Sequence, residues 1–327
     1  MLTFQDLPDE VLLKILTFSE TKDLIGCGQV SKRIRRISRD GTLWMMANLE
    51  KKIVKTELLE MILRKGCRIL NLSHSEILGA FSLNEFKSQI TVLNLSYSNE
   101  ETFAFVLEDL LSSCFSLQHL IMKGVYLTPE MASSICKNGK TLQILNLNSS
   151  CLDFISNHPI NYLQEIIKGC QELKEIDLAH VDEFNGLQSE DLEFLVQNIS
   201  PNVEKLNLGS SKITDEDVEI LLRRCNKMTA LSLEATWITD DSLKNIRQHL
   251  NLTLEELSLD FGINNMNGYN IFNSFLELKS MPRLKTLNLY NKKDKDREIQ
   301  NLKQHLPHLR IRTWSERNCE MKFLQKP

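Results

Sequence analysis

Cysteine and histidine are the residues in this sequence that could most readily bind a metal ion or act as nucleophiles, and the chain has eight of the first and seven of the second. A structural zinc site needs four such ligands at short, regular spacings, as in C-x-x-C with a nearby pair of histidines. Several cysteines instead stand alone, shortly before an apolar residue: Cys114, Cys170 and Cys225. We expect each of them to be a small apolar residue that closes a helix onto the core, with metal binding as the alternative.

The sequence contains no recognisable catalytic pattern. It has no G-x-S-x-G nucleophile turn, no glycine-rich phosphate loop and no H-E-x-x-H metal motif. His305 and His308 are close together, but no carboxylate or thiol stands at a ligand spacing from them. We therefore expect a protein that is not an enzyme and that needs no cofactor.

The amino-acid composition indicates in which cellular compartment the protein works and which classes of partner it binds. The 43 acidic residues outnumber the 39 Lys and Arg, giving a formal net charge of −4, whereas nucleic-acid-binding domains are usually basic. No stretch approaches the roughly 18 apolar residues of a membrane span, and acidic residues near the start of the chain are unlike a signal peptide. Eight cysteines without such a signal are typical of reduced thiols. We expect a protein of the nucleus and cytoplasm that binds neither nucleic acid nor membranes.

A leucine-containing phrase recurs along most of the chain, in forms such as RILNLS, LQILNLN and VEKLNLG. Its spacing of 22 to 31 residues is typical of leucine-rich repeats. In each short strand the two residues that flank the x of L-x-L point inward, and the residue between them points outward. We predict an α/β fold in which about ten repeats, over residues 67–311, form a curved solenoid with parallel strands inside and helices outside. The ten phrases have their first apolar residue at positions 70, 93, 120, 145, 176, 206, 231, 257, 287 and 309.

The segment LPDEVLLKILTF, residues 7–18, has too many apolar residues for a helix with one buried side. Pro8 suits the first helical position, and Asp9 and Glu10 suit the positive end of the helix dipole. The apolar residues then cover roughly half of the helix circumference, although a surface helix needs an arc of only about 100°. The surplus face is covered either by more of this chain or by another chain.

The sequence also predicts the borders of the regions. Residues 1–45 lack the repeat phrase and are expected to form a small helical unit of three helices. Residues 46–66 contain no Gly or Pro before Gly66 and carry apolar residues at helical spacing, which indicates a stiff helical connector rather than a flexible linker. Residues 312–327 form a C-terminal tail that could fold back along the strands, with its apolar residues Trp314, Met321 and Phe323 as anchors.

The N-terminal residues resemble a known family. The order and spacing of the following residues are similar to those of an F-box: Leu7, Pro8, Glu10, Ile15, Leu16, Leu24, Val30, Ser31, Lys32, Arg33, Leu43 and Trp44. Ser31 and Ile34 depart from the pattern, which commonly has Cys and Trp there. With cysteine-containing repeats after it, this region makes the chain resemble the leucine-rich-repeat class of F-box proteins.

The resemblance implies a function. In this class the F-box docks on the Skp-type adaptor of a cullin–RING ubiquitin ligase, and the repeats bind a protein substrate that is then ubiquitinated and degraded. The surplus face of the first helix would be the docking surface, unless it packs on the first repeat as a plain cap. Two alternatives are a repeat scaffold or inhibitor outside ubiquitin chemistry and an F-box protein of a non-degradative complex. The candidate adaptor-binding residues are Leu7, Pro8, Leu12, Leu13, Leu16, Lys32, Leu43 and Trp44.

Substrate contacts are expected on the concave face and on the loops that follow the strands. Aromatic side chains are frequent at binding hot spots, and the substrate-binding candidates are Lys212, Trp237, Phe261 and Tyr290. The resemblance also implies a role for the late repeats and tail, and a cyclin-kinase regulatory subunit that reads a phosphorylated residue as a candidate partner. The residues in the middle of the strands are mostly small and polar, and could equally be ordinary solvated positions: Asn71, Asn94, Ile121, Asn146, Asp177, Asn207, Ser232, Ser258, Asn288 and Arg310.

Overall fold

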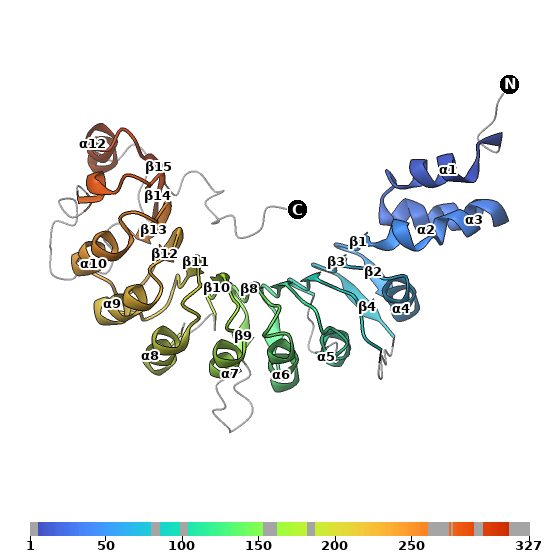
Figure 1. The fold of residues 1–327 in the computed structure, drawn as a ribbon, viewed down its shortest axis with the longest axis horizontal. Helices are drawn as coiled ribbons and strands as arrows, with labels where there is room; N and C mark the ends of the chain where they lie inside the picture. Colours follow the sequence, from blue (N-terminus) through green and yellow to red (C-terminus); the bar gives the residue numbers. More distant parts are fainter. Residues whose placement is uncertain are drawn as a thin grey trace. The chain divides into compact units, whose positions relative to one another are not determined.

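The computed structural model describes residues 6–79, 86–98, 104–152, 162–181, 187–260, 275, 277–290 and 297–313. The chain divides into two compact units, Met1–Val125 and Tyr126–Pro327. Each unit contains repeats in which a short strand is paired in parallel with the strand of the next repeat. The predicted class, an N-terminal helical region followed by α/β repeats, is therefore confirmed (Figure 1).

Three helices and a short 3-10 turn begin the first unit. They are α1 (Asp9–Leu16), α2 (Thr21–Val30), α3 (Lys32–Ser38) and η2 (Gly41–Trp44). α2 continues through both of its glycines and ends before Ser31, whose backbone is extended. The Ser31 hydroxyl caps α3 by accepting a hydrogen bond from Ile34 N at 3.1 Å. α3 packs against α1 and α2, so it is the centre of this helical region.

The predicted helical connector, residues 46–66, is wrong in its first half. It contains two strands, β1 (Met46–Asn48) and β2 (Ile53–Lys55), before the helix α4 (Thr56–Arg64). β1 pairs in parallel with the first predicted repeat strand, in the register Ala47↔Leu70. This segment is thus a repeat in its own right, hidden in the sequence because Ala47 stands where the other repeats have a larger apolar residue.

The rest of the first unit follows the predicted repeats. Its further elements are β3 (Ile69–Asn71), β4 (Glu76–Leu78), β5 (Val92–Asn94), α5 (Ala104–Ser112) and β6 (His119–Ile121). The strands β1, β3, β5 and β6 are neighbours in one parallel sheet, and β2 pairs separately with β4.

The second unit alternates strands with helices in the same way. Its strands on one side of the repeats are β8 (Ile144–Asn146), β10 (Glu175–Asp177), β11 (Lys205–Asn207), β12 (Ala230–Leu233), β13 (Glu256–Asp260), β14 (Thr286–Tyr290) and β15 (Arg310–Thr313). The helices on the other side are α6 (Pro129–Lys137), α7 (Tyr162–Gly169), α8 (Ser189–Asn198), α9 (Asp215–Arg224), α10 (Asp240–Leu250) and α12 (Arg297–His305), as Figure 1 shows. The unit also has β7 (Tyr126–Leu127), which pairs with β9 (Cys151–Leu152), and the 3-10 turn η4 (Glu277–Ser280).

The inward residues of the strands form the core of both units. From β3 to β14, both apolar positions of each L-x-L phrase are at most 2% exposed, and each such burial contributes roughly 1.5–3 kcal/mol. β15 corrects one detail of the prediction, because Leu287 pairs with Ile311 and not with Leu309. The outward mid-strand residue of the last repeat is therefore Arg312 instead of Arg310.

A turn of constant geometry follows most strands. The mid-strand side chain accepts a hydrogen bond from the backbone N–H two residues later, for example Asn71 Oδ1 from Ser73 N and Asn207 Oδ1 from Gly209 N, each at 3.0 Å. One residue further, the backbone has a positive φ of 52–61°, a conformation that L-residues adopt infrequently. These left-handed positions are Lys51, His74, Tyr97, Gly124, Ser149, His180, Ser210 and Ala235.

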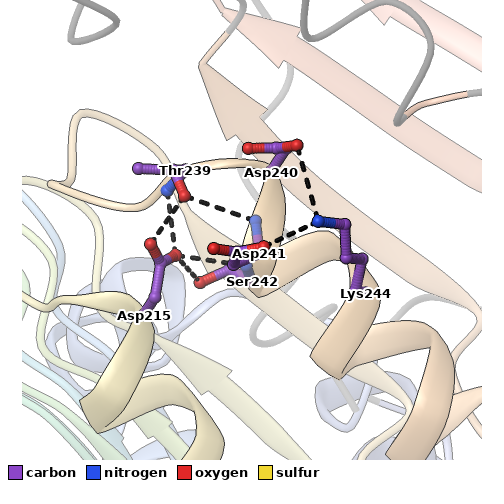
Figure 2. A network of polar contacts seen from close by, with 6 residues as sticks. All are labelled: Asp215, Thr239, Asp240, Asp241, Ser242 and Lys244. Carbon is purple, nitrogen blue, oxygen red and sulfur yellow. Dashed lines mark hydrogen bonds and ion pairs between the residues drawn. The ribbon is translucent and has the colours of Figure 1, made fainter. Parts of the chain in front are cut away.

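One carboxylate joins two late repeats of the second unit. Asp215, the first residue of α9, accepts from the N–H and hydroxyl of Thr239, at 2.9 and 2.6 Å. It also accepts from the hydroxyl of Ser242 and, at 3.1 Å, from its N–H. Figure 2 shows this carboxylate facing the start of α10, whose N-cap is Thr239. Asp215 therefore satisfies donors at the N-terminus of the next helix, which would otherwise lack partners.

Candidate functional site

The structure separates core from surface among the predicted adaptor-binding residues. Four of the eight are buried, at 0–7% exposure: Leu12, Leu16, Leu43 and Trp44. This burial corrects their assignment, because a side chain packed inside the helical region cannot also be its contact surface. Leu7 and Leu13 are half-buried, and Pro8 and Lys32 are exposed.

A row of exposed apolar side chains lies on a second face of α1, next to the buried face of Leu12 and Leu16. Val11 is 42% exposed and Ile15 is 39% exposed, and with Pro8 before them they follow a spacing of three and four residues that places them on one helical face. Phe18, just after the helix, is 82% exposed. We call these four residues the apolar stripe. Val11, Ile15 and Phe18 were not among the predicted adaptor-binding residues, although their helical spacing was a signal that could have found them.

Two arginines of α3 hold α1 in this orientation. Arg33 Nε donates to Asp9 Oδ1 at 2.8 Å, and Arg33 Nη2 donates to the carbonyl of Leu7 at 2.6 Å. Arg36 forms a second ion pair with Asp9. The hydrogen bond from Arg33, helped by the charges of both arginines, holds the pKa of the Asp9 carboxyl below its usual value. These contacts join the two helices at the start of α1, so the buried face stays inward and the apolar stripe stays outward.

One further hydrogen bond lies within the helical region, and another attaches this region to the first repeat of the same unit. Trp44 Nε1 donates to the carbonyl of Ser38 at 2.7 Å, which satisfies the indole of a side chain only 3% exposed. The hydroxyl of Thr21 accepts from the N–H of Asn48 in β1 at 3.1 Å. The helical region thus has its own core and is attached to β1, while the apolar stripe takes part in neither role.

The predicted substrate-binding residues Lys212 and Trp237 lie together in the second unit. They occupy equivalent loop positions after β11 and β12, and Lys212 Nζ is 5.9 Å from the centroid of the Trp237 ring. Lys212 Nζ also donates to Gln188 Oε1 at 2.6 Å, while Trp237 is 57% exposed. An exposed indole beside a positioned ammonium group is chemically suited to contact a protein ligand. Phe261, the side chain of Tyr290 and the tail residues Trp314, Met321 and Phe323 lie outside the described parts of the chain.

The mid-strand polar residues of the second unit are more enclosed than expected of solvated positions. Asn146, Asp177, Ser232, Ser258 and Asn288 are all at most 3% exposed. They bond to one another across strands, as when Asn146 Nδ2 donates to Asp177 Oδ2 at 3.0 Å and Asn288 Nδ2 to Ser258 Oγ at 2.8 Å. In the structure these side chains support the strands and their turns, so the exposed loop residues are the better candidates for substrate contact.

The cysteines that precede strands are buried, as expected. Cys114, Cys170 and Cys225 are at most 1% exposed, and burial raises the pKa of the Cys114 and Cys225 thiols to about 11. Such thiols behave as small apolar groups. Within the described ranges, no group of three or more His, Cys, Asp and Glu side chains could hold a metal ion. Nor is any helix in those ranges long and apolar enough to cross a membrane.

Comparison with known families gives two matches that together span most of the chain. The family described as F-box-like matches residues 4–49, which include α1 to η2. The family described as the SKP2 LRR domain matches residues 57–316, which is well over half of the chain and covers repeats of both units.

Several solved structures contain similar chains. LegL7, a leucine-rich repeat-containing protein from Legionella pneumophila, is 17% identical over 72% of this chain and 79% of its own, with a TM-score of 0.42. The mouse RP105/MD-1 complex contains a chain that is 16% identical over 82% of this chain and 43% of its own, with a TM-score of 0.45. Actin-binding site 2 of leiomodin-1 is 19% identical over 46% of this chain and 90% of its own, with a TM-score of 0.30.

Proposed function

The chain belongs to the F-box proteins that carry an SKP2-type leucine-rich-repeat domain, and from this premise we propose that it is the substrate-recognition subunit of a Skp–cullin–F-box ubiquitin ligase. Its sequence resembles that of the S-phase kinase-associated F-box protein, in agreement with the description of the matched repeat family. In this role the N-terminal helices dock on a Skp-type adaptor, and the repeats hold a protein substrate for ubiquitination and degradation.

The observation that carries this proposal is the apolar stripe. Val11, Ile15 and Phe18 are exposed by 39–82% although the same helix has a well-packed buried face through Leu12 and Leu16. The pairing of Asp9 with Arg33 and Arg36 holds the helix so that this second face points outward. A preorganised apolar face costs little to order on binding, and its burial by a partner is favourable. The adaptor of the ligase is the partner that an F-box of this kind fits.

The substrate side of the proposal rests on the loops of the second unit. Trp237 and Lys212 offer an exposed ring and a cation held by Gln188. A single cation of this kind suits a substrate with an acidic or phosphorylated segment next to an apolar residue. A cyclin-kinase regulatory subunit that reads such a phosphate would be a further partner at the late repeats.

The chain itself would supply no catalytic group. Other subunits of the ligase transfer ubiquitin, and this chain raises the effective concentration of the substrate beside them. Its place of action would be the nucleus and the cytoplasm, where thiols are ordinarily kept reduced.

A comparison of protein abundance tests this function. Cells would express either the full chain or its Ile15→Asp variant, which places a charge in the middle of the apolar stripe. The expected result is a set of proteins that the repeats capture from both cell lines and that accumulate only with the variant. If the intact chain binds the adaptor but no captured protein changes in abundance, degradation is not its function and the non-degradative complex is favoured. If the intact chain does not bind the adaptor, a repeat scaffold or inhibitor outside ubiquitin chemistry is favoured.

A further inference from the structure

Two cysteines from consecutive repeats of the second unit meet where their helices end. Cys136 lies in the last turn of α6, and Cys170 follows α7 directly. The two helices pack together, and glycines allow their ends to approach closely. A Cβ added to Gly139 would lie 2.1 Å from the carbonyl oxygen of Gly169, and one added to Gly169 would lie 3.1 Å from Cys136 Sγ.

The contacts of both cysteines place the two free thiols next to each other. Cys170 Sγ lies 3.9 Å from the carbonyl oxygen of Ile135, the residue before Cys136, and a Cβ on Gly169, the residue before Cys170, would lie 3.1 Å from Cys136 Sγ. The polar interaction between the two thiols lowers the pKa of the Cys136 thiol, whereas the same interaction and burial raise the pKa of Cys170. Cys136 is half-buried and Cys170 is fully enclosed. The more accessible thiol is therefore also the one that ionises more readily, and the thiolate is the reactive form.

Other repeats place a different group beside the equivalent cysteine. Ser88 Oγ donates to Cys114 Sγ at 3.3 Å, and Cys225 Sγ donates to the carbonyl of Ser200 at 3.4 Å. A serine hydroxyl in one repeat and a backbone carbonyl in the other are thus sufficient beside the buried cysteine. The second thiol at residue 136 is not required by the repeat architecture, and it adds a chemistry that a hydroxyl does not have.

We propose that Cys136 and Cys170 form a reversible disulfide when the protein meets hydrogen peroxide. The thiolate sulfur of Cys136 attacks one peroxide oxygen, the O–O bond breaks, and hydroxide leaves, so that Cys136 is oxidised to a sulfenic acid and the peroxide is reduced. The Cys170 sulfur then attacks the Cys136 sulfur, the S–O bond breaks, and the departing hydroxyl takes the Cys170 proton to leave as water. A thiol reductant restores both thiols by exchange.

The disulfide would crosslink two neighbouring repeats at their helix ends. In a repeat array each unit is stabilised mainly by its neighbours, so this bond would fix the α6–α7 interface under oxidising conditions. Ordinary cytosolic conditions would return it to the reduced state, as is usual for transient regulatory disulfides.

Peptide mapping of the full chain tests the proposal. The reduced protein would be treated with hydrogen peroxide, its remaining thiols alkylated, and the sample digested without reduction. We expect a peptide pair joined through Cys136 and Cys170 that disappears after treatment with dithiothreitol. One disulfide consumes two thiols, so the thiols counted in the denatured chain should fall from eight to six. Oxidation of Cys136 to a sulfinic acid with Cys170 still alkylated, and no joined peptide, would refute the proposal.

Two serine variants complete the experiment. Cys136→Ser places a hydroxyl beside Cys170, as Ser88 stands beside Cys114, so we expect it to fold and to retain all seven of its thiols after peroxide. Cys225→Ser removes a cysteine at the position equivalent to Cys170 and should still form the disulfide, falling from seven thiols to five. A loss of two thiols from Cys136→Ser, with its circular dichroism unchanged, would assign the oxidation to other cysteines and overturn the proposal.

Discussion

Replacement of Asp215 by alanine tests whether the repeats of the second unit are joined as the structure shows. The carboxylate accepts four hydrogen bonds from Thr239 and Ser242 at the start of α10. Loss of helix-capping acceptors costs about 1 kcal/mol. Ser242 is fully buried, so its unsatisfied N–H and hydroxyl cost about 1–3 kcal/mol more. Asp215→Ala should therefore lower the free energy of unfolding by about 2–4 kcal/mol.

Asp241→Ala is the matched control for this prediction. Asp241 also lies in the first turn of a helix, but it is exposed, and its carboxylate pairs with the neighbouring Lys244, as Figure 2 shows. Its removal should cost at most about 0.5 kcal/mol. Urea titrations of the three proteins, followed by circular dichroism, give the comparison. If Asp215→Ala is no less stable than Asp241→Ala, the carboxylate does not join α9 to α10 and the argument from its hydrogen bonds is wrong.

Two further predictions concern the surfaces. Leu12→Ala removes a fully buried side chain of α1 and should destabilise the N-terminal helices by about 2–5 kcal/mol, measured by hydrogen exchange over residues 9–44; exchange equal to that of the intact chain would contradict its place in the core. Trp237→Ala removes an exposed ring and should change the unfolding free energy by less than about 0.5 kcal/mol, while weakening the capture of a substrate more than about tenfold. Equal capture by Trp237→Ala and the intact chain would remove this loop from the substrate site.

The repeats were predictable because their pattern follows directly from strand geometry. Alternation of inward and outward residues and a constant period are properties of the sequence itself, so each of the ten phrases corresponds to a strand. The first strand, β1, was not predicted, because Ala47 occupies the inward position where the other repeats have a larger residue. The end of the last repeat was shifted because Leu309 and Ile311 both fit the pattern, and only the pairing with Leu287 decides between them.

The candidate site was predictable only in part. The apolar residues of α1 cover about half of its circumference. The sequence alone does not show which of them are buried, since Leu12 and Ile15 are chemically alike. That choice is made by the pairing of Asp9 with Arg33, a residue 24 positions away. The contact of Cys136 with Cys170 likewise needs the stacking of α6 on α7. By contrast, Lys212 and Trp237 occupy equivalent positions in successive repeats, so the repeat period alone is enough to predict that they lie close together.

Calorimetry with a purified Skp-type adaptor tests the central claim most directly. The full chain would be compared with a Val11→Asp, Ile15→Asp double variant and with Phe105→Asp, which changes an equally apolar and 76% exposed residue of α5. The intact chain and Phe105→Asp should bind alike. The double variant should lose about 100-fold or more in affinity, since two apolar contacts of about 1 kcal/mol each are lost and two charges enter the interface. Equal binding by the double variant would contradict the apolar stripe as the docking surface, and no binding by the intact chain would contradict the ligase function itself.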